Sequence, residues 1–416
     1  MICKQFRYAS AKRFGSPCLA GHLDEVPEPG LLESYQPAET FMDTVLGKPP
    51  GRLSQGEDCL QLRVCTNDPS ARRPVMVYVH GGGFFTGSGL WPWYSQRRLV
   101  LEHDVVAVNI NYRLGALGLA VIPSVCQGNI ALLDQIAALQ WVQRYIGMFG
   151  GDPENVTVYG QSAGAMSILN LLRSSAAAGL FRRAILQSPL PEYAATDLAT
   201  NQHRTGLVWG RSVAPDELPA VASFPAEQLA EGYGRAMAEA TLGGGETLLA
   251  PVIGQTPLEG PADWHVEGVD VLAGWTHHEM GFWGVDRQRV VAETSKHFAE
   301  PITQRLNEFA KRGANVAGYR IDWEPKGSAF GACHCVELPL LLGTEQDWEG
   351  APILGTETGY QDALGLNMRR QWAQFATTGH IDPALDTPGG IRYGIGPAGI
   401  ANLCLGHNMA GTRERT

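Results

Sequence analysis

The sequence has no long apolar run and no strongly basic segment, and each absence narrows what the protein can be. No run of about 18 apolar residues occurs in its 416 residues, so a membrane-spanning helix is not expected. The 32 basic residues are outnumbered by 42 acidic ones and form no cluster, which argues against nucleic acid and anionic lipid as partners. The N-terminus lacks the apolar stretch of a secretory signal, so we expect a soluble, cytoplasmic protein.

Cysteine is scarce and dispersed. The eight cysteines are scattered through a long chain and are not packed into a short scaffold, so we expect most of them to be reduced and no disulfide framework. Cys333, His334 and Cys335 place possible metal ligands together, but a structural zinc site needs four ligands and no second Cys/His pair stands at the usual spacing. We therefore predict no metal and no cofactor.

Strand-like and helix-like segments alternate along the chain, which predicts an α/β fold. Apolar residues at helical spacing predict a long helix over 129–149. Two segments differ from this alternation: 191–262 is rich in alanine and 284–315 is polar and helix-prone. We interpret both as cap-like helical insertions in a single domain that spans residues 1–416. The predicted strands are 75–80, 105–112, 156–159, 183–187, 269–273 and 316–323.

The most informative motif is Gly-Gln-Ser-Ala-Gly at 160–164, between the predicted strand 156–159 and a helix-like run. A serine between two glycines at a strand-to-helix turn is typical of a nucleophile elbow, because the sharp turn leaves no room for larger neighbours. We therefore predict that Ser162 is a nucleophile. Such a pentapeptide arises by chance in about one comparable chain in four, so its surroundings must decide.

A triple glycine at 81–83 follows the predicted strand 75–80. Glycines leave backbone N–H groups uncovered, so a ligand oxyanion can approach them closely. In nucleophile-elbow enzymes the amide of the residue after the serine completes the oxyanion hole, and that residue is Ala163. An ordinary glycine-rich loop is the alternative.

The orienting acid should lie between the serine and the histidine in chain order. Glu279 lies on the loop just after the predicted strand 269–273, where a carboxylate can face the site, whereas Asp270 and Asp286 are weaker candidates. A solvated surface charge is the alternative for any one of them.

A general base is needed to take the proton of the serine. His334 lies in a loop beyond the predicted strand 316–323, from which it can reach back to the carboxyl edge of the sheet. His297 and His380 are its rivals, and a structural role is the alternative for each histidine.

Together these motifs resemble the type-B carboxylesterases, the cholinesterase-like branch of the α/β-hydrolase fold. The resemblance covers nearly the whole chain and is specific in its combination of motifs. It implies a mostly parallel, twisted central sheet flanked by helices. The segments that carry it are 55–62, 77–89, 109–118, 128–129, 133–135, 141–142, 149–153, 160–165, 278–281, 331–343 and 372–379.

The resemblance assigns roles by position. It implies that Ser162 is the nucleophile, that His334 is the general base and acid, and that Glu279 orients the imidazole. It also places the oxyanion donors. These are the backbone N–H groups of Gly82, Gly83 and Ala163.

The chain departs from the family pattern in ways that bear on its substrate. Many members have Glu before the nucleophile, so Gln161 argues against a cationic ester. Cys335 replaces the glycine that commonly follows the histidine, and Cys59 lacks the upstream partner of secreted relatives, which fits a reducing compartment.

Only 55 residues separate Glu279 from His334, so we expect a reduced cap and an open substrate pocket. Such pockets are mostly apolar, and aromatic residues near the motifs are candidates for its walls. We predict that the pocket is lined by Phe84, Phe85, Trp275, Phe282 and Trp283.

The resemblance therefore implies a serine hydrolase that cleaves a small, uncharged, hydrophobic ester through an acyl-enzyme. A biosynthetic acyl transferase, lactonase or cyclase that uses the same site is the alternative. A binding relative without catalysis is a third reading, which the presence of every catalytic residue disfavours.

Overall fold

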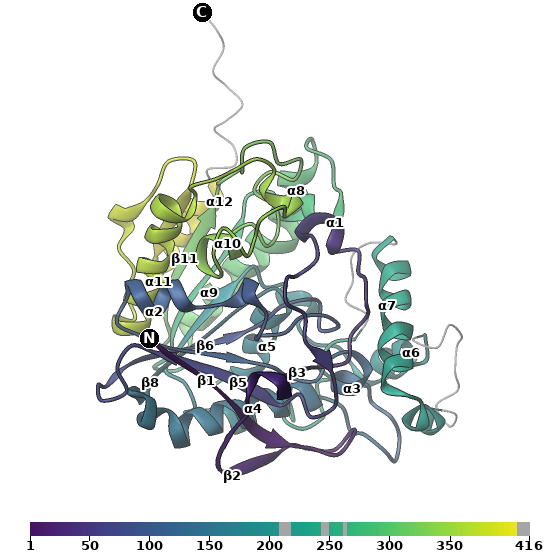
Figure 1. Cartoon of the computed structure of the whole chain (residues 1–416). Coiled ribbons are helices and arrows are strands. Elements are labelled where there is room, and N and C mark those ends of the chain that lie inside the picture. Colours follow the sequence, from purple (N-terminus) through teal and green to yellow (C-terminus); the bar gives the residue numbers. More distant parts are fainter. Residues whose placement is uncertain (208–217, 243–248, 261–263, 406–416) are drawn as a thin grey trace, which may run out of the picture.

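A ten-stranded sheet forms the centre of the protein (Figure 1). The structure is a computed structural model that describes residues 1–207, 218–242, 249–260 and 264–405. The strands lie in the order β12-β11-β10-β9-β8-β6-β7-β5-β1-β2, and those from β6 to β11 run parallel to one another. Their bounds are β1 (Ile2–Ser10), β2 (Cys18–Glu25), β5 (Gln61–Thr66), β6 (Arg73–Val79), β7 (Val106–Ile110), β8 (Gly151–Gln161), β9 (Arg183–Gln187), β10 (Asp270–Thr276), β11 (Asn315–Ile321) and β12 (Ile391–Ile395), with β3 (Leu32–Glu33) and β4 (Ser54–Gln55) in a separate pair.

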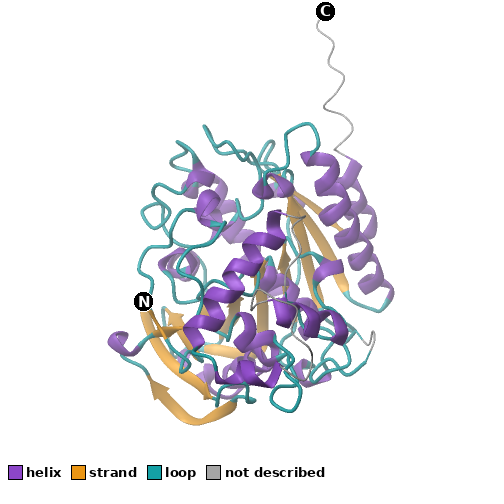
Figure 2. Ribbon diagram, turned by 90° about the vertical axis from the view of Figure 1, so that its right-hand side faces the viewer, coloured by secondary structure: helices purple, strands orange, loops and turns teal. Residues whose placement is uncertain are grey.

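Helices cover both faces of the sheet, as Figure 2 shows from the side. Successive strand residues point to opposite faces. In β6, Val77 therefore packs in one core cluster with Trp141 of α4, and Tyr78 packs in the other with Trp372 of α11. This arrangement confirms the predicted α/β fold. The helices are α1 (Asp43–Leu46), α2 (Arg97–Glu102), α3 (Gly115–Leu119), α4 (Ile130–Tyr145), α5 (Ala163–Leu171), α6 (Leu198–Leu207), α7 (Ala226–Leu242), α8 (Val290–Thr294), α9 (Glu300–Lys311), α10 (Leu338–Leu341), α11 (Leu366–Thr378) and α12 (Gly396–Leu405).

The parallel strands bring distant loops to one edge of the sheet. Parallel neighbours end at the same edge, so the loops that follow β6, β8, β10 and β11 meet there. These loops begin with the triple glycine, Ser162, Glu279 and the segment that leads to His334, respectively. The fold therefore gathers the predicted site residues from four separate places in the sequence.

The two segments predicted as insertions take different positions. In 191–262, α6 and α7 lie together beside the sheet (Figure 1), and part of this segment lies outside the described residues. In 284–315, α9 packs against β10, β11 and α12 and so covers the sheet. This second segment therefore supplies part of the helical layer as well as the short helix α8.

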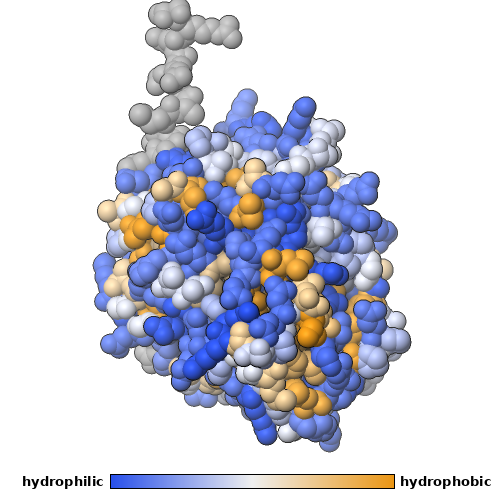
Figure 3. Space-filling model, turned by 60° about the vertical axis from the view of Figure 1, so that its left-hand side comes forward, coloured by the Kyte–Doolittle hydropathy of each residue, from blue (hydrophilic) through white to orange (hydrophobic). Residues whose placement is uncertain are grey.

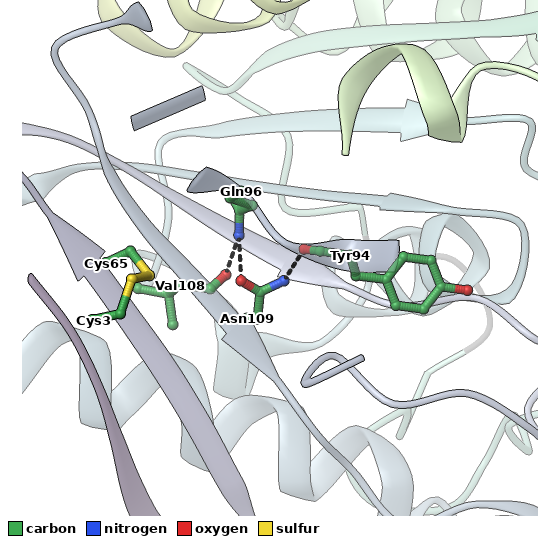
Figure 4. The surroundings of a disulfide bond; sticks show 6 residues. All are labelled: Cys3, Cys65, Tyr94, Gln96, Val108 and Asn109. Atoms are coloured by element: carbon green, nitrogen blue, oxygen red, sulfur yellow. Dashed lines mark hydrogen bonds between the residues drawn. A yellow bond between two sulfur atoms is a disulfide. The ribbon is translucent and has the colours of Figure 1, made fainter. Parts of the chain in front are cut away.

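One disulfide joins two of the eight cysteines, which agrees with the expectation that most cysteines are reduced and form no disulfide framework. Cys3 of β1 and Cys65 of β5 lie directly opposite each other in the antiparallel pair and are joined by a disulfide bond. Figure 4 draws this bond beside Val108 of the next strand, β7. The expectation of free thiols is correct for the other six cysteines: Cys18, Cys59, Cys126, Cys333, Cys335 and Cys404.

The surface view in Figure 3 shows a mainly hydrophilic face with small scattered groups of hydrophobic residues. Exposed large apolar side chains such as Leu101 and Met148 are consistent with this picture. In the described part of the chain, no helix is both long and apolar enough to cross a membrane.

Candidate active site

Ser162 occupies a sharp turn between β8 and α5. Its backbone angles, φ 55° and ψ −122°, lie outside the regions that most residues adopt. A Cβ atom on Gly160 would lie 2.6 Å from the carbonyl oxygen of Val79, and one on Gly164 would lie 2.1 Å from it. Both flanking positions therefore require glycine, and the turn presents the Ser162 side chain to a cavity at the sheet edge.

His334 and Glu279 form a buried hydrogen-bonded pair. Nδ1 of His334 lies 2.6 Å from Oε2 of Glu279, and both side chains are almost fully buried. Oε1 of the same carboxylate accepts a hydrogen bond from the backbone N–H of Thr276 at 2.8 Å, which fixes its orientation. Because Glu279 accepts the Nδ1 proton, Nε2 of the neutral ring is free to act as a proton acceptor.

Nε2 of His334 faces Gln161. The side-chain nitrogen of Gln161 lies 3.1 Å from Nε2 and 3.2 Å from the sulfur of Cys335. Ser162 and His334 line the same cavity, yet within the described residues no hydrogen bond joins the Ser162 hydroxyl to Nε2. In this arrangement the Gln161 amide donates a hydrogen bond to Nε2 of His334, the atom that would have to accept the proton of the Ser162 hydroxyl. The sequence drew attention to Gln161 only for its missing charge.

Gly82, Gly83 and Ala163 line the same cavity as Ser162. Among the described residues none of their three backbone N–H groups has a hydrogen-bond partner, and that of Ala163 is unused because helix α5 begins there. Gly82 has φ 98°, and a Cβ atom on it would lie only 2.0 Å from the carbonyl oxygen of Thr86. The loop therefore keeps its shape only with glycine at this position.

Aromatic rings surround the imidazole of His334. The ring centroids of Trp283, Phe282 and Phe298 lie 5.0, 5.5 and 5.7 Å from it. Phe282 also contacts Phe41, edge to face at 6.2 Å. These contacts restrict the ring to one orientation and keep bulk water from it.

The cavity has a volume of about 110 Å³ and opens to solvent at its mouth. The charged side chains on its walls already have partners: Asp43 bonds Thr40, Lys48 bonds Glu39 and Arg52 bonds Glu33. Its apolar lining residues are Phe41, Met42, Leu46, Trp91, Trp93, Tyr94, Met166, Leu190, Tyr193, Met237, Phe282, Trp283, Cys335 and Leu338.

One wall of the cavity is held to the sheet by an amide network. Figure 4 shows Asn109 of β7 donating to the backbone oxygen of Tyr94, at 2.8 Å. Gln96 donates to the side chain of Asn109 at 3.0 Å and to the backbone oxygen of Val108 at 2.9 Å. The aromatic segment 91–94 therefore has a fixed position relative to the central strands.

The structure divides the predicted pocket residues. Phe282 and Trp283 line the cavity. Phe84, Phe85 and Trp275 do not; they are at most 2% exposed and belong to the hydrophobic core. The prediction for these three residues is therefore corrected. Closeness in sequence to a motif brought them near the site, but their side chains turn inward to fill the core.

The rival acids and bases have other partners. Asp270 bonds Arg183 at 2.9 Å, and Asp286 accepts from the backbone of Gln288. His297 lies 3.5 Å from Glu293 of the preceding helical turn. These residues and His380 are not among those that line the cavity.

A second buried carboxyl group lies beneath the pair, and the sequence analysis missed it. Glu337 is fully buried, and burial, followed by the charge of Glu279, raises its pKa to about 8. Its Oε1 lies 3.5 Å from the side-chain nitrogen of Gln187, and within the described residues its Oε2 has no hydrogen-bond partner. Its position three residues after His334 was the available signal.

Comparisons with known proteins agree with this geometry. The sequence profile of the carboxylesterase family matches residues 8–296. The chain is 35% identical to a probable N-octanoylanthranilate hydrolase of Rhodococcus erythropolis, over 91% of this chain and 89% of that protein. It is 31% identical to phenmedipham hydrolase of Pseudarthrobacter oxydans, over 84% and 79%, and 30% identical to para-nitrobenzyl esterase of Bacillus subtilis strain 168, over 78% and 75%.

Solved structures show the same fold. A thermophilic PNB esterase superimposes with a TM-score of 0.76, covering 97% of this chain and 96% of that one at 24% identity. These structures have the α/β-hydrolase fold, which the resemblance of the motifs implied.

Proposed function

Since the chain belongs to the carboxylesterase family and is a carboxylic ester hydrolase, we propose that it cleaves its substrate through Ser162, His334 and Glu279. The observation that carries this proposal is that Ser162 and His334 line one cavity, while Glu279, from a third loop, is bonded to His334 at 2.6 Å. A nucleophile, a base and an orienting carboxylate in this order are what acyl transfer needs.

In the proposed reaction, the Ser162 hydroxyl attacks the ester carbonyl while Nε2 of His334 takes its proton. Gln161 first has to release Nε2, since its amide occupies that atom at 3.1 Å. The C–O bond of the ester breaks, and His334 returns the proton to the leaving alkoxide. Water then attacks the acyl-enzyme by the same route, which releases the acid and restores Ser162.

The developing oxyanion is proposed to bind at the N–H groups of Gly82, Gly83 and Ala163. Their lack of other partners among the described residues supports this role, because such donors need no rearrangement when charge forms. Glu279 stabilises the imidazolium that forms on His334 and holds the ring in the productive tautomer.

We propose an uncharged, hydrophobic substrate. The cavity walls are mainly apolar, and the charged wall residues are bonded to protein partners. Tyr193 and Met237 come from the 191–262 segment, so we propose that this segment acts as the reduced cap over the site.

N-aryl amides and carbamates form a second candidate class. The names of two relatives favour it, because one hydrolyses N-octanoylanthranilate and the other phenmedipham. An ester and an N-aryl amide of the same acid form the same acyl-enzyme and differ in the leaving group that His334 must protonate, whereas a carbamate forms a carbamoyl-enzyme.

The test is hydrolysis of matched p-nitrophenyl esters and p-nitroanilides of graded acyl length by the wild-type protein and by Ser162→Ala. We expect the wild-type protein to turn over these substrates and Ser162→Ala to reduce the rate by about 10⁴-fold or more. Ser70→Ala, in an exposed loop, should leave the rate unchanged. Wild-type turnover by Ser162→Ala would refute the mechanism. Preference for anilides over esters would favour the second class.

A further inference from the structure

The loops that carry Glu279 and His334 are bonded to each other next to the catalytic pair. The backbone N–H of His278 donates to the carbonyl oxygen of Ala332 at 2.8 Å, and that of His334 donates to Glu279 at 3.3 Å. A third bond uses a side chain: the N–H of Ala332 donates to Nδ1 of His278 at 3.3 Å. His278 is therefore bonded to the histidine loop through both its backbone and its ring.

The ring of His278 has little freedom to move. It stacks on His277 with centroids 4.6 Å apart and planes 14° apart, and its side chain is only 15% exposed. A Cβ atom on Gly331 would lie 2.7 Å from Nδ1 of His278, and Gly331 has φ 64°. The histidine loop thus approaches this ring so closely that only glycine fits between them.

We propose that His278 is a positioning residue, which holds the histidine loop against the acid loop through its Nδ1 bond to Ala332 and so fixes the distance between His334 and Glu279. The inference rests on the roles proposed above for His334 and Glu279. His278 does not line the substrate cavity, so it acts only through its neighbours. A displacement of about 1 Å at a catalytic group can cost about 100-fold in rate, so a small loop shift suffices to matter.

The bond depends on the charge of His278, because only an unprotonated Nδ1 can accept from Ala332. Burial lowers the pKa of His278; Glu324, 3.7 Å away, and Asp322 oppose this, and Arg287 reinforces it. His277, stacked on the ring, faces Asp322 at 3.8 Å. As the pH falls through this lowered pKa, Nδ1 gains a proton, the bond to Ala332 is lost, and the imidazolium pairs with Glu324.

The experiment compares His278→Leu, which removes the acceptor, with His278→Asn, whose Oδ1 stands where Nδ1 stands and cannot titrate. His277→Asn is the matched control, because it changes the stacked neighbour and leaves the Ala332 bond intact. For His278→Leu at about pH 8 we expect kcat to fall about 10- to 100-fold with KM changed less than about 2-fold. For His278→Asn we expect kcat within about 2-fold of wild type at pH 8, and a less steep loss of log kcat toward acid pH.

Three results would overturn the inference. One is a full kcat for His278→Leu, another is a loss in His278→Asn as large as in His278→Leu, and the third is an acid profile of His278→Asn as steep as that of the wild type. If His278→Leu does not fold, the acid profile of His278→Asn decides alone. Glu279→Gln separates this inference from the proposed function: full activity of Glu279→Gln contradicts the function, whereas an inactive Glu279→Gln beside a fully active His278→Leu contradicts only the role of His278.

Discussion

At the scale of single residues, the contact between Gln161 and His334 is the feature that sequence reasoning could not supply. The order of Ser162, Glu279 and His334 along the chain predicted that they meet; the structure places Ser162 and His334 on one cavity and bonds Glu279 to His334 behind it. Which atom faces Nε2 of His334 depends on the side-chain rotamer of Gln161 and on the backbone of Cys335, with φ 76°. A sequence motif contains neither quantity.

Glu337 shows the same limit for electrostatics. Its pKa is raised to about 8 because the fold buries it and places it near Glu279. At neutral pH the folded protein therefore keeps this carboxyl group protonated. Its position three residues after His334 indicates that it is near the site, but the local sequence does not show that the fold buries it.

This raised pKa predicts how stability depends on pH. In the unfolded chain Glu337 has its ordinary pKa near 4.5 and is ionised above that pH. In the folded protein its pKa is about 8, so the carboxyl group keeps its proton up to about pH 8. Between these two pH values the folded state binds one more proton than the unfolded state. The contribution of Glu337 to the free energy of unfolding therefore falls as the pH rises. Glu337→Gln has no group that titrates here, so it does not lose stability in this way. We expect its free energy of unfolding, relative to that of the wild type, to rise by up to about 4 kcal/mol between about pH 5 and pH 8.

Urea unfolding at several pH values measures this difference. Glu154→Gln, whose wild-type side chain is 84% exposed, is the control and should show no such trend. A difference between Glu337→Gln and wild type that stays constant from pH 5 to pH 8 would contradict the account.

At the scale of elements, the predicted strands were found because each is a short β-branched run bounded by turn residues. The segment 183–187 coincides with β9, and 75–80 differs from β6 by a few residues at its start and one at its end. The predicted helix over 129–149 is α4 followed by a 3-10 helix over Ile146–Phe149. The prediction that Phe84, Phe85 and Trp275 line the pocket was wrong, because a residue's position in the sequence does not show whether its ring fills the core or the wall of a cavity.

The glycine loop after β6 provides a prediction at this scale. In Gly82→Ala the new Cβ would lie 2.0 Å from the Thr86 carbonyl oxygen, so the loop must shift. Its N–H groups would then no longer point at the oxyanion. We expect kcat to fall about 100-fold with a smaller change in KM, since an oxyanion donor acts in the transition state.

Gly147→Ala is the matched control, because a Cβ atom there contacts nothing within 4 Å. Steady-state kinetics on one ester serve for both variants. Full kcat in Gly82→Ala would show that this loop does not bind the oxyanion.

At the scale of the whole molecule, the parallel sheet decides where the site lies, because it aligns the ends of β6, β8, β10 and β11. The alternation of segments predicted this edge. It did not predict that segment 38–52, which belongs to none of the motifs, lines the cavity, or that a disulfide joins β1 to β5. Both depend on contacts between residues remote in sequence.

The Cys3–Cys65 disulfide predicts a redox effect on global stability. It closes a loop with a sequence separation of 62 residues, for which loop entropy allows a stabilisation of up to about 4 kcal/mol. We expect a reductant to lower Tm of the wild type by about 2 to 5 °C and to leave Tm of Cys3→Ser unchanged. Calorimetry with and without reductant makes the comparison, and equal shifts in both proteins would contradict it.

The central claim is that Ser162 is a nucleophile activated by His334 and Glu279. Reaction with a fluorophosphonate followed by peptide mass spectrometry tests it most directly, because the reagent forms a stable bond with an activated serine. We predict one adduct, on the peptide that contains Ser162, with no adduct in Ser162→Ala and a much slower reaction in His334→Ala. Labelling of Ser162→Ala at the wild-type rate, or an adduct on another residue of the wild type, would contradict the claim.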